Sequence, residues 1–388
     1  MKTNRWLYGF FPGFLVFFPA VLLFCTDPVM AAGQVQTQAE SEGLIPAGRT
    51  DFVYAQCVEI QEYENGFKRI DVQDDASYLL VPKGEEIPEN IPEDIRILQV
   101  PSERIYLAAT ASMALFDAIG GLDHIKMSSL KAPDWYVDNA RKAMEAGQIL
   151  YAGKYSEPDF ELLLAQNCDL AIESTMIYHS PKTKEMIEQL GIPVFVDRSS
   201  YEPHPLGRCE WIKVYGAMIG KEKEAESFFD SQLALLDELD DYSSGGKTVA
   251  FFSVNSSNVV VVRRNSDYVP RMIEMAGGTY ALSGIELLKD ESGTSTVNMT
   301  MEEFYAAAVN ADYLVYNASI EAPLYSINDL IGKNELFAGF KAVKEGQVWC
   351  TDRYLYQATD IVGQLIRDFH IMLTGGDESE ITFLKHLS

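Results

Sequence analysis

The chain has 388 residues, 47% of them hydrophobic and 23% charged, which is enough apolar material for two domains with complete cores. Asp and Glu number 57 against 31 Lys and Arg, so the formal net charge is −26 at pH 7. This balance argues against nucleic acid as a partner, because nucleic-acid-binding proteins carry a basic face and this chain has no long Lys/Arg run. The acidity instead fits a soluble, well-hydrated surface.

The N-terminus has the features of an export signal. Lys2 and Arg5 precede a long apolar run, and small residues around Ala31 provide a cleavage site. A second possibility is lipidation of Cys25, because the four residues that end there are similar to a bacterial lipobox, and a third is an uncleaved anchor. All three place the folded part outside the cytoplasmic membrane, at the cell surface or in a periplasm, with the N-terminal anchor as its membrane contact.

Five cysteines are present, at positions 25, 57, 168, 209 and 350, without a CxxC pair or the spacing of a zinc motif. A Cys57–Cys350 disulfide is compatible with an oxidising compartment, although the pattern does not require it. Cys168 begins an apolar stretch and is predicted to be a core residue.

Changes in composition and periodicity divide the chain into six segments. They are a signal segment (1–31), a flexible tether (32–48), an N-terminal β-hairpin extension (49–95), an N-terminal α/β lobe (96–205), an inter-lobe helical linker (206–242) and a C-terminal α/β lobe (243–388). Within the extension, the turn Glu64-Asn65-Gly66 predicts a hairpin with strands near 52–63 and 67–72.

The lobes are predicted from an alternation of strands and helices, which is typical of a parallel sheet. In the first lobe, strands are expected at 104–109, 124–129, 169–173 and 192–196, and helices at 112–119, 158–166 and 181–190. The second lobe repeats this plan, with strands at 248–254, 259–262, 313–316 and 347–350 and helices at 269–276, 301–309 and 358–373. The linker has apolar residues at helical steps and a possible helix end at Gly220. The predicted fold is therefore α/β, with two Rossmann-like lobes joined by a long helical linker and a ligand cleft between them.

The predicted loops at the carboxyl ends of the strands are rich in Tyr, Trp and Arg, and ligands of open α/β sheets bind at those ends. Aromatic rings offer wide apolar contact with a polar tip, and arginine forks suit carboxylate or phosphate groups. Some of these arginines are expected to pair with surface Asp and Glu instead. The candidate ligand-binding residues are Trp135, Tyr155, Tyr178, Arg198, Arg208, Arg263, Arg264, Tyr268 and Tyr354.

Signatures of catalysis and of metal binding are mostly absent. The sequence has no HExxH, GxSxG or GxGxxG motif, and no spacing indicates a catalytic triad. His179, His204 and Glu202 are the nearest approach to a metal-ligand set, but the sequence does not bring them to one point. We therefore predict no catalytic residue, no metal ligand and no cofactor.

Several stretches resemble the substrate-binding lipoproteins of ABC importers, in the helical-backbone group that serves ferric siderophores, haem and cobalamin. The likeness runs from about Arg104 to Leu373, and the hairpin at 49–80 lies outside it. The stretches that carry it are RIYLAAT (104–110) with Gly120-Gly121, EPDFELLLA (157–165) with CDLAI (168–172), LGIPV (190–194), GAMIGKEKEA (216–225), MAGG (275–278) and, as the most specific, FKAVKEGQV (340–348). Cys168 stands where the family commonly has proline.

The resemblance implies two lobes on a rigid helix, with modest closure on a ligand. It also implies that one glutamate on each lobe meets arginines of an ABC permease, and Glu161 and Glu302 match those positions. The expected protein is a monomeric, non-enzymatic receptor that captures a ferric siderophore, haem or a corrinoid and delivers it to the permease. The alternatives are an exported enzyme or metal-binding scaffold with a metal site between the lobes, and a receptor for a free divalent cation with His179 and His204 as ligands.

Overall fold

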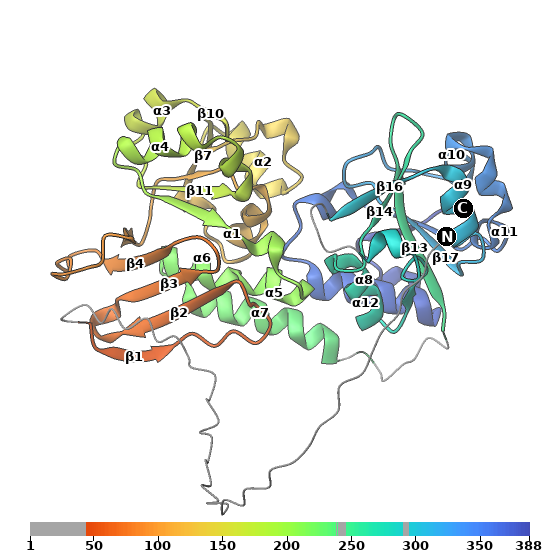
Figure 1. The fold of residues 1–388 in the computed structure, drawn as a ribbon, viewed down its shortest axis with the longest axis horizontal. Coiled ribbons are helices and arrows are strands. Elements are labelled where there is room, and N and C mark those ends of the chain that lie inside the picture. The colour runs from red at the N-terminus through yellow and green to blue at the C-terminus, as the bar shows by residue number, and fades with distance from the viewer. Residues whose placement is uncertain (1–43, 238, 240–245, 290–294) are drawn as a thin grey trace, which may run out of the picture. The chain divides into compact units, whose positions relative to one another are not determined.

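The computed structural model describes residues 44–237, 239, 246–289 and 295–388, all within one compact unit, Ser41–Ser388. The predicted signal segment, the lipidation of Cys25 and most of the predicted tether lie outside the described residues. Two lobes of α/β structure and an additional N-terminal sheet make up this unit (Figure 1). The predicted α/β fold with two lobes is confirmed.

The N-terminal extension is a five-stranded sheet rather than a single hairpin. Its strands, in the order in which they pair, are β1 (Pro46–Arg49), β2 (Val58–Tyr63), β3 (Lys68–Val72), β4 (Ser77–Pro82) and β5 (Ile95–Val100). The predicted turn is present, with Asn65 at φ 61° and Gly66 at φ 80°. β1 begins inside the predicted tether, and β5 extends beyond the predicted end of the extension. β5 pairs in parallel with β4, whereas the other pairs are antiparallel.

The first strand of the predicted hairpin begins later than expected, at Val58, because two buried glutamates bind the backbone before it. Glu210 accepts hydrogen bonds from the backbone N–H groups of residues 53, 54 and 55, at 2.8–2.9 Å. Glu202 accepts from those of residues 56 and 57, at 2.7 and 2.9 Å. Backbone donors that bind carboxylates in this way cannot join a sheet ladder.

The N-terminal lobe has a parallel sheet in the order β12-β11-β6-β7-β8. Its strands are β6 (Ile105–Leu107), β7 (Ile125–Ser128), β8 (Leu150–Tyr151), β11 (Leu170–Ser174) and β12 (Val194–Asp197), with a small ribbon of β9 (Gly153–Lys154) and β10 (Glu157–Pro158). Its helices are α1 (Met113–Ala118), α2 (Asp138–Glu145), α3 (Phe160–Ala165) and α4 (Pro181–Gln189). The sequence did not predict α2, whose one buried residue is Ala140, so it has little apolar pattern.

The linker consists of three consecutive helices, α5 (Pro205–Glu210), α6 (Ile212–Ile219) and α7 (Glu222–Asp237). Gly220 ends α6 in the left-handed conformation, at φ 72°, as predicted from its position. Nearly every residue of α6 is buried, whereas α7 buries one stripe that includes Ala225 and Phe229. Residue 238 and residues 240–242 of the predicted linker lie outside the described residues.

The C-terminal lobe does not repeat the plan of the first lobe. Its sheet has the order β16-β14-β13-β17-β18-β19, and only β13, β17 and β18 are parallel to one another along this path. The strands are β13 (Thr248–Val254), β14 (Val260–Arg263), β15 (Thr279–Tyr280), β16 (Thr296–Met299), β17 (Tyr313–Tyr316), β18 (Val348–Thr351) and β19 (Leu384–His386). The helices are α8 (Tyr268–Met275), α9 (Met301–Ala308), α10 (Ile327–Lys333), α11 (Lys341–Lys344) and α12 (Val362–Thr374). The turn after β13 is a tight hairpin, and such a turn makes the next strand antiparallel.

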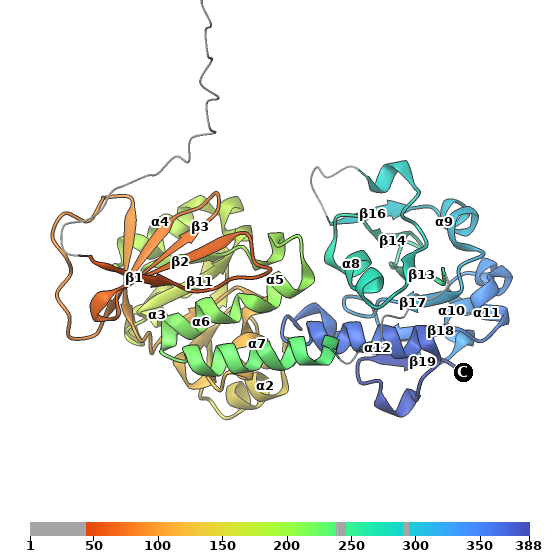
Figure 2. The same ribbon diagram turned by 90° about the horizontal axis from the view of Figure 1, so that it is seen from below.

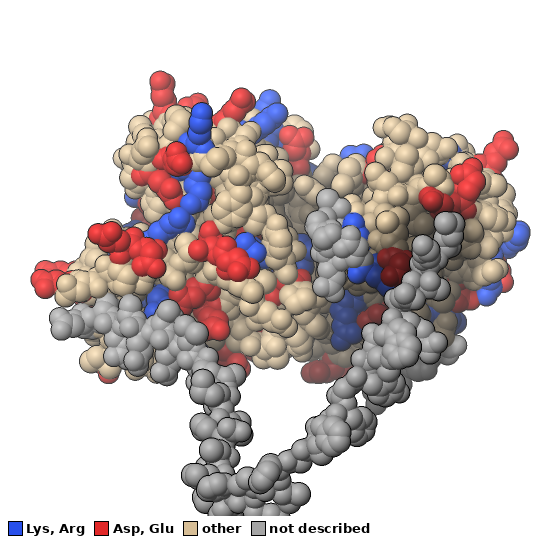
Figure 3. Space-filling model, in the orientation of Figure 1, with Lys and Arg blue, Asp and Glu red and all other residues tan. Residues whose placement is uncertain are grey.

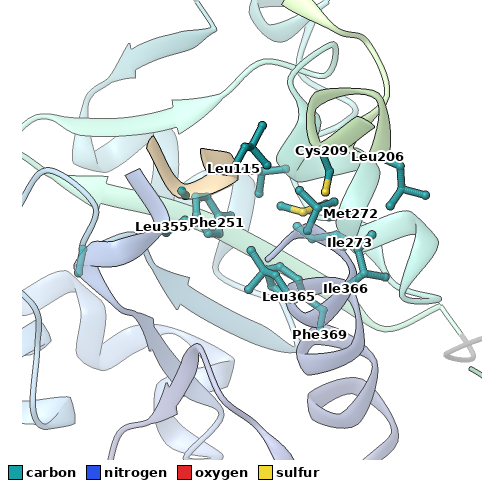
Figure 4. Close-up of a cluster of buried hydrophobic side chains, with 14 of the residues drawn as sticks. Leu115, Leu206, Cys209, Phe251, Met272, Ile273, Leu355, Leu365, Ile366 and Phe369 are labelled. Atoms are coloured by element: carbon teal, nitrogen blue, oxygen red, sulfur yellow. The ribbon is translucent and has the colours of Figure 1, made fainter. Parts of the chain in front are cut away.

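The apolar core continues from the linker into the C-terminal lobe. Leu206 and Cys209 of α5 meet Met272 of α8 and Leu365 and Ile366 of α12, all at most 1% exposed (Figure 4). α7 also reaches the first turn of α12, where Gln232 Oε1 accepts a hydrogen bond from the Gly363 N–H at 3.1 Å (Figure 2). The linker is therefore packed into both lobes rather than spanning them as an isolated helix.

Candidate functional site

The N-terminal lobe has a topological switch point between β6 and β11. The chain adds β7 and β8 on one side of β6 and then β11 and β12 on the other. In open parallel sheets, ligands bind beyond the carboxyl ends of the strands at such a point. Residues 108–112 follow β6 there, the 3-10 helix Thr175–His179 follows β11, and residues 198–201 follow β12. These segments are three of the predicted ligand-binding loops.

Three of the predicted ligand-binding residues form one cluster, and they come from the linker and the C-terminal lobe. Arg208 lies on α5, Tyr268 opens α8, and Arg263 ends β14. The guanidinium of Arg208 lies over the Tyr268 ring, 4.0 Å from its centre, and that of Arg263 lies 5.9 Å from it. Cation–π attraction stabilises a tyrosine ring that two guanidinium groups approach at these distances. The structure thus joins the linker and the C-terminal lobe through residues predicted to bind a ligand.

Local hydrogen bonds fix the orientation of this cluster. Asp267 caps α8 by accepting from the Val269 N–H at 3.0 Å, which places Tyr268 in the first helical position. Its other oxygen lies 3.4 Å from Arg263 Nη1. The Tyr280 hydroxyl donates to the Arg263 carbonyl at 2.9 Å, so the backbone of Arg263 is held as well. The cluster is therefore largely preorganised.

Tyr178 and Arg198 lie at the carboxyl ends of β11 and β12, but their partners come from the N-terminal sheet. The Tyr178 hydroxyl donates to Asp75 Oδ1, and Arg198 Nη2 lies 3.7 Å from Asp74 Oδ2. Both aspartates belong to the turn between β3 and β4. The sequence analysis found this extension outside the family resemblance and left its role open.

The other four predicted residues lie apart from these groups. Trp135 is 1% exposed and its Nε1 donates to Ser128 Oγ at 3.1 Å, so the prediction that it faces a ligand is wrong. Its ring fills the core of the first lobe. The Tyr354 hydroxyl donates to Asp360 Oδ2 at 2.8 Å, and Arg264 Nη1 donates to the Leu287 carbonyl at 3.1 Å. Tyr155 packs against the apolar cluster beneath β6 and β11.

Gln357 joins the two lobes and was missed by the sequence analysis. Its Oε1 accepts from the Tyr136 N–H at 2.8 Å, and its Nε2 donates to the Asp134 carbonyl at 2.8 Å. Arg353 Nη1 also donates to the Tyr136 hydroxyl at 3.3 Å. Gln357 is 1% exposed, so these bonds are protected from water. A single glutamine in a polar loop has no pattern that would have revealed this role.

Two aspartates near these contacts have raised pKa values. Burial raises the pKa of Asp360 from 3.8 to about 6, and the negative charge of Asp117 adds to the increase. Burial also raises the pKa of Asp197, which directly precedes Arg198. The side-chain bond from Tyr354 opposes the shift of Asp360 without cancelling it. Protonation of these carboxyl groups is therefore favoured at higher pH than for exposed aspartates.

The comparisons with known proteins identify the fold and the family. A family model described as periplasmic binding protein matches residues 108–355. The chain belongs to the periplasmic binding protein family. The family predicted from the sequence is therefore confirmed, and the match includes the linker and most of both lobes. The N-terminal sheet lies outside the matched residues.

The relatives of this binding protein differ in what their names describe. An uncharacterized lipoprotein of Methanocaldococcus jannaschii is 26% identical over 325 residues, which cover 80% of this chain and 76% of that protein. A periplasmic heme binding protein from Pseudomonas aeruginosa has a similar fold, with a TM-score of 0.55, 14% identity and coverage of 74% of this chain and 98% of that chain. A periplasmic catecholate-siderophore binding protein from Vibrio cholerae has a TM-score of 0.54, 13% identity and coverage of 70% and 94%. At these identities the solved structures establish the fold alone.

The two predicted docking glutamates of the binding protein are both accessible. Glu161 lies in the first turn of α3 and Glu302 in the first turn of α9, one on each lobe, and both side chains are exposed. Asp159 and Thr300 cap these two helices. The glutamates are therefore held on short, capped helices, a placement that suits a contact with another protein.

The alternative set of metal ligands does not converge. Glu202 accepts from Trp211 Nε1 at 2.8 Å in addition to two backbone N–H groups, and His204 Nδ1 accepts from the Leu206 N–H at 3.2 Å. In the part of the chain that the structure describes, no group of three or more His, Cys, Asp or Glu is arranged to hold a metal ion.

Cys57 and Cys350 are both free and buried, so the possible disulfide between them is not formed.

Acidic side chains are spread over the face shown in Figure 3, with Lys and Arg between them. Among the described residues, no helix has the length and apolar character needed to cross a membrane.

Proposed function

We propose that this binding protein is the extracytoplasmic receptor of an ABC importer, which captures a ferric siderophore or a similar iron complex and delivers it to the permease. The observation that carries the proposal is the cluster of Arg208, Tyr268 and Arg263, which joins the linker to the C-terminal lobe. Arg263 lies at the end of β14 and Tyr268 at the start of α8, so both side chains extend from the ends of their elements. The names of the Pseudomonas and Vibrio structures support this class of ligand.

Binding by this protein would involve no covalent step. An aromatic ring and guanidinium groups provide apolar contact and forked donors, which recognise the oxygen-rich shell of a metal chelate. Gln357 and Arg353, which bond to the first lobe, would hold the lobes around the bound ligand. Glu161 and Glu302 would then meet the permease. The export signal, with Cys25 lipidated or the chain cleaved after Ala31, would place the receptor at the cell surface or in a periplasm, in line with the lipoprotein relative.

The test is a titration of the full chain, exported by its host and purified, with ferric siderophores, haem, cobalamin and free divalent ions. Tryptophan fluorescence reports binding, because a coloured complex quenches it. We expect saturable quenching by one class of iron complex and at least about tenfold weaker binding by Arg208→Ala, which loses a charged contact. The matched control is Arg271→Ala, because Arg271 lies on α8 beside Tyr268 but pairs with Glu274 at 3.0 Å.

Three results would contradict the proposal. One is a folded chain that is not quenched by any iron complex or corrinoid, and a second is equal weakening by Arg208→Ala and Arg271→Ala. The third is tight binding of a free divalent ion alone, which would favour the cation-receptor alternative.

A further inference from the structure

The turn between β3 and β4 reaches the ligand-binding end of the N-terminal lobe. Asp74 lies 3.7 Å from Arg198, which directly follows β12, and Asp75 accepts from Tyr178, which follows β11. The Tyr78 hydroxyl also donates to Asp75, at 3.1 Å. This turn therefore contacts two of the three segments that lie at or beside the switch point.

The side chains around the turn form an open, partly aromatic surface. Tyr178 is 42% exposed, Tyr201 is 56% exposed and Met176 is 47% exposed. The guanidinium of Arg198 lies over the Tyr201 ring, 4.7 Å from its centre. Arg198 Nε is buried and has no hydrogen-bond partner among the described residues. We name Asp74, Asp75, Tyr178, Arg198 and Tyr201 the turn surface.

The turn is held rigidly in this position. The Gln73 N–H donates to the Cys57 carbonyl at 2.9 Å, and Cys57 is in turn bound to Glu202. The Tyr78 hydroxyl also accepts from the Val196 N–H of β12 at 3.4 Å, so the first strand after the turn is attached to the edge of the lobe. The two aspartates therefore have a fixed position beside the carboxyl ends of β11 and β12.

The charges of the turn surface and of the Arg208 cluster balance without a positive excess. Three arginines are present, Arg198, Arg208 and Arg263, and the aspartates beside them are Asp74, Asp75 and Asp267. Asp197 adds a further carboxyl, whose pKa is raised by burial. Arg96 and Glu188 form the next ion pair outward, at 3.5 Å, and this pair adds no net charge. The aspartates therefore offset the positive charge of these arginines, in line with the expectation that some of the arginines pair with Asp and Glu.

We propose that the β3–β4 turn of the N-terminal sheet is part of the ligand-binding site, and that Asp74 and Asp75 make the receptor select uncharged or cationic chelates over anionic ones. The inference rests on the proposed receptor function. An anionic ligand on the turn surface would have to compete with Asp74 for Arg198 and would lie beside Asp75. An uncharged chelate would use the tyrosine rings and leave the ion pair intact.

The experiment compares the binding of two iron chelates of different charge to the full, exported chain. One is a ferric tris-hydroxamate, whose iron centre is uncharged, and the other is a ferric tris-catecholate, which carries a net negative charge. The test variant is Asp74→Asn with Asp75→Asn, since asparagine tolerates the φ of 54° at position 74 and keeps the hydrogen-bonding shape. The matched control is Glu85→Gln with Glu86→Gln, an exposed acidic pair just beyond the opposite end of β4.

We expect the wild-type chain to bind the tris-hydroxamate more tightly than the tris-catecholate. The double asparagine variant should bind the tris-catecholate about three- to tenfold more tightly than wild type, with a smaller gain at high salt. The glutamine control should leave both affinities unchanged. If the double variant does not fold, Asp74→Asn alone carries the test, because that side chain is 74% exposed.

A wild-type preference for the tris-catecholate would overturn this inference but leave the receptor function in place. If the asparagine and glutamine variants change the affinity for the tris-catecholate equally, the turn is not part of the ligand-binding site. If no iron chelate or corrinoid binds, the proposed function fails, and the inference fails with it.

Discussion

Glu202 and Glu210 show how single residues tie an additional element to this fold. Both are buried, and together their carboxylates accept five backbone N–H groups from residues 53–57. Lys213 Nζ lies 3.0 Å from Glu210 and supplies an opposite charge. A buried carboxylate is tolerated when it is hydrogen-bonded and paired in this way, and each charge-assisted bond contributes about 1.5–3 kcal/mol. Two side chains at the start of the linker thus fix the entry to the N-terminal sheet.

The ionisation of Asp360 should make the stability of the protein depend on pH. Its pKa of about 6 in the folded protein lies above the value of 3.8 for a free aspartate, so the folded state binds the proton more tightly than the unfolded state. The charged form therefore costs stability, and this cost is absent below pH 4 and complete above pH 6. Asp360→Asn lacks this cost. We therefore expect its free energy of unfolding, relative to that of wild type, to be roughly 1–2 kcal/mol higher at pH 7 than at pH 4.5.

Urea unfolding of both proteins at the two pH values measures this difference. Asp123→Asn is the control, because the Asp123 side chain is 79% exposed. Its replacement should not change how the free energy of unfolding depends on pH. If the stability of Asp360→Asn relative to wild type were the same at both pH values, the raised pKa would be refuted.

At the scale of elements, the contact between α7 and α12 depends on a glycine. A Cβ added at Gly363 would come closer than 3.0 Å to the carbonyl oxygen of Gln232, which is backbone and cannot swing aside. The same two residues share the hydrogen bond from the Gly363 N–H to Gln232 Oε1. The glycine therefore sets how near the linker approaches the C-terminal lobe.

We expect Gly363→Ala to lower the free energy of unfolding by about 1–3 kcal/mol, as overpacking of a tight contact does. Gly332→Ala is the matched control, since Gly332 is also helical, in α10, and a Cβ there would meet nothing within 4 Å. The control should be neutral or gain up to about 1 kcal/mol, because alanine is the better helix former. Thermal unfolding of the two variants tests both statements, and equal melting temperatures would contradict the first.

Elements with strong local patterns were predictable, and those set by distant contacts were not. The apolar runs of β11, β12 and β13 and the cap at Gly220 gave correct elements. α2 lacks an apolar stripe, and the late start of β2 depends on Glu202 and Glu210, more than 140 residues away in the chain. The rule about strand ends selected Arg208, Arg263 and Tyr268. It could not reveal that Tyr178 bonds to Asp75, 103 residues earlier, or that Trp135 turns into the core.

At the scale of the whole molecule, the N-terminal sheet completes the first lobe instead of standing beside it. β12 is the edge strand of the parallel sheet, and two residues of the additional sheet bond to its backbone: Arg96 donates to the Val194 carbonyl, and the Tyr78 hydroxyl accepts from the Val196 N–H. An uncovered edge strand invites pairing with other chains, so this cover protects the protein from association through β12. One apolar cluster includes Ile60 and Tyr78 of this sheet, the linker and the C-terminal lobe. The described residues therefore unfold, in our interpretation, as one cooperative unit.

The proposed contact with the permease gives the last prediction. Glu161 and Glu302 are exposed on opposite lobes, so reversing their charge should leave the ligand site intact. We expect Glu161→Lys with Glu302→Lys to keep the affinity for the iron complex while reducing ligand-stimulated ATP hydrolysis by the reconstituted importer at least about tenfold, because facing like charges repel. Glu185→Lys with Glu335→Lys, an exposed glutamate on each lobe, should keep full stimulation. Equal loss in both pairs would indicate a general effect of net charge, and unchanged stimulation in the first pair would place the permease contact elsewhere.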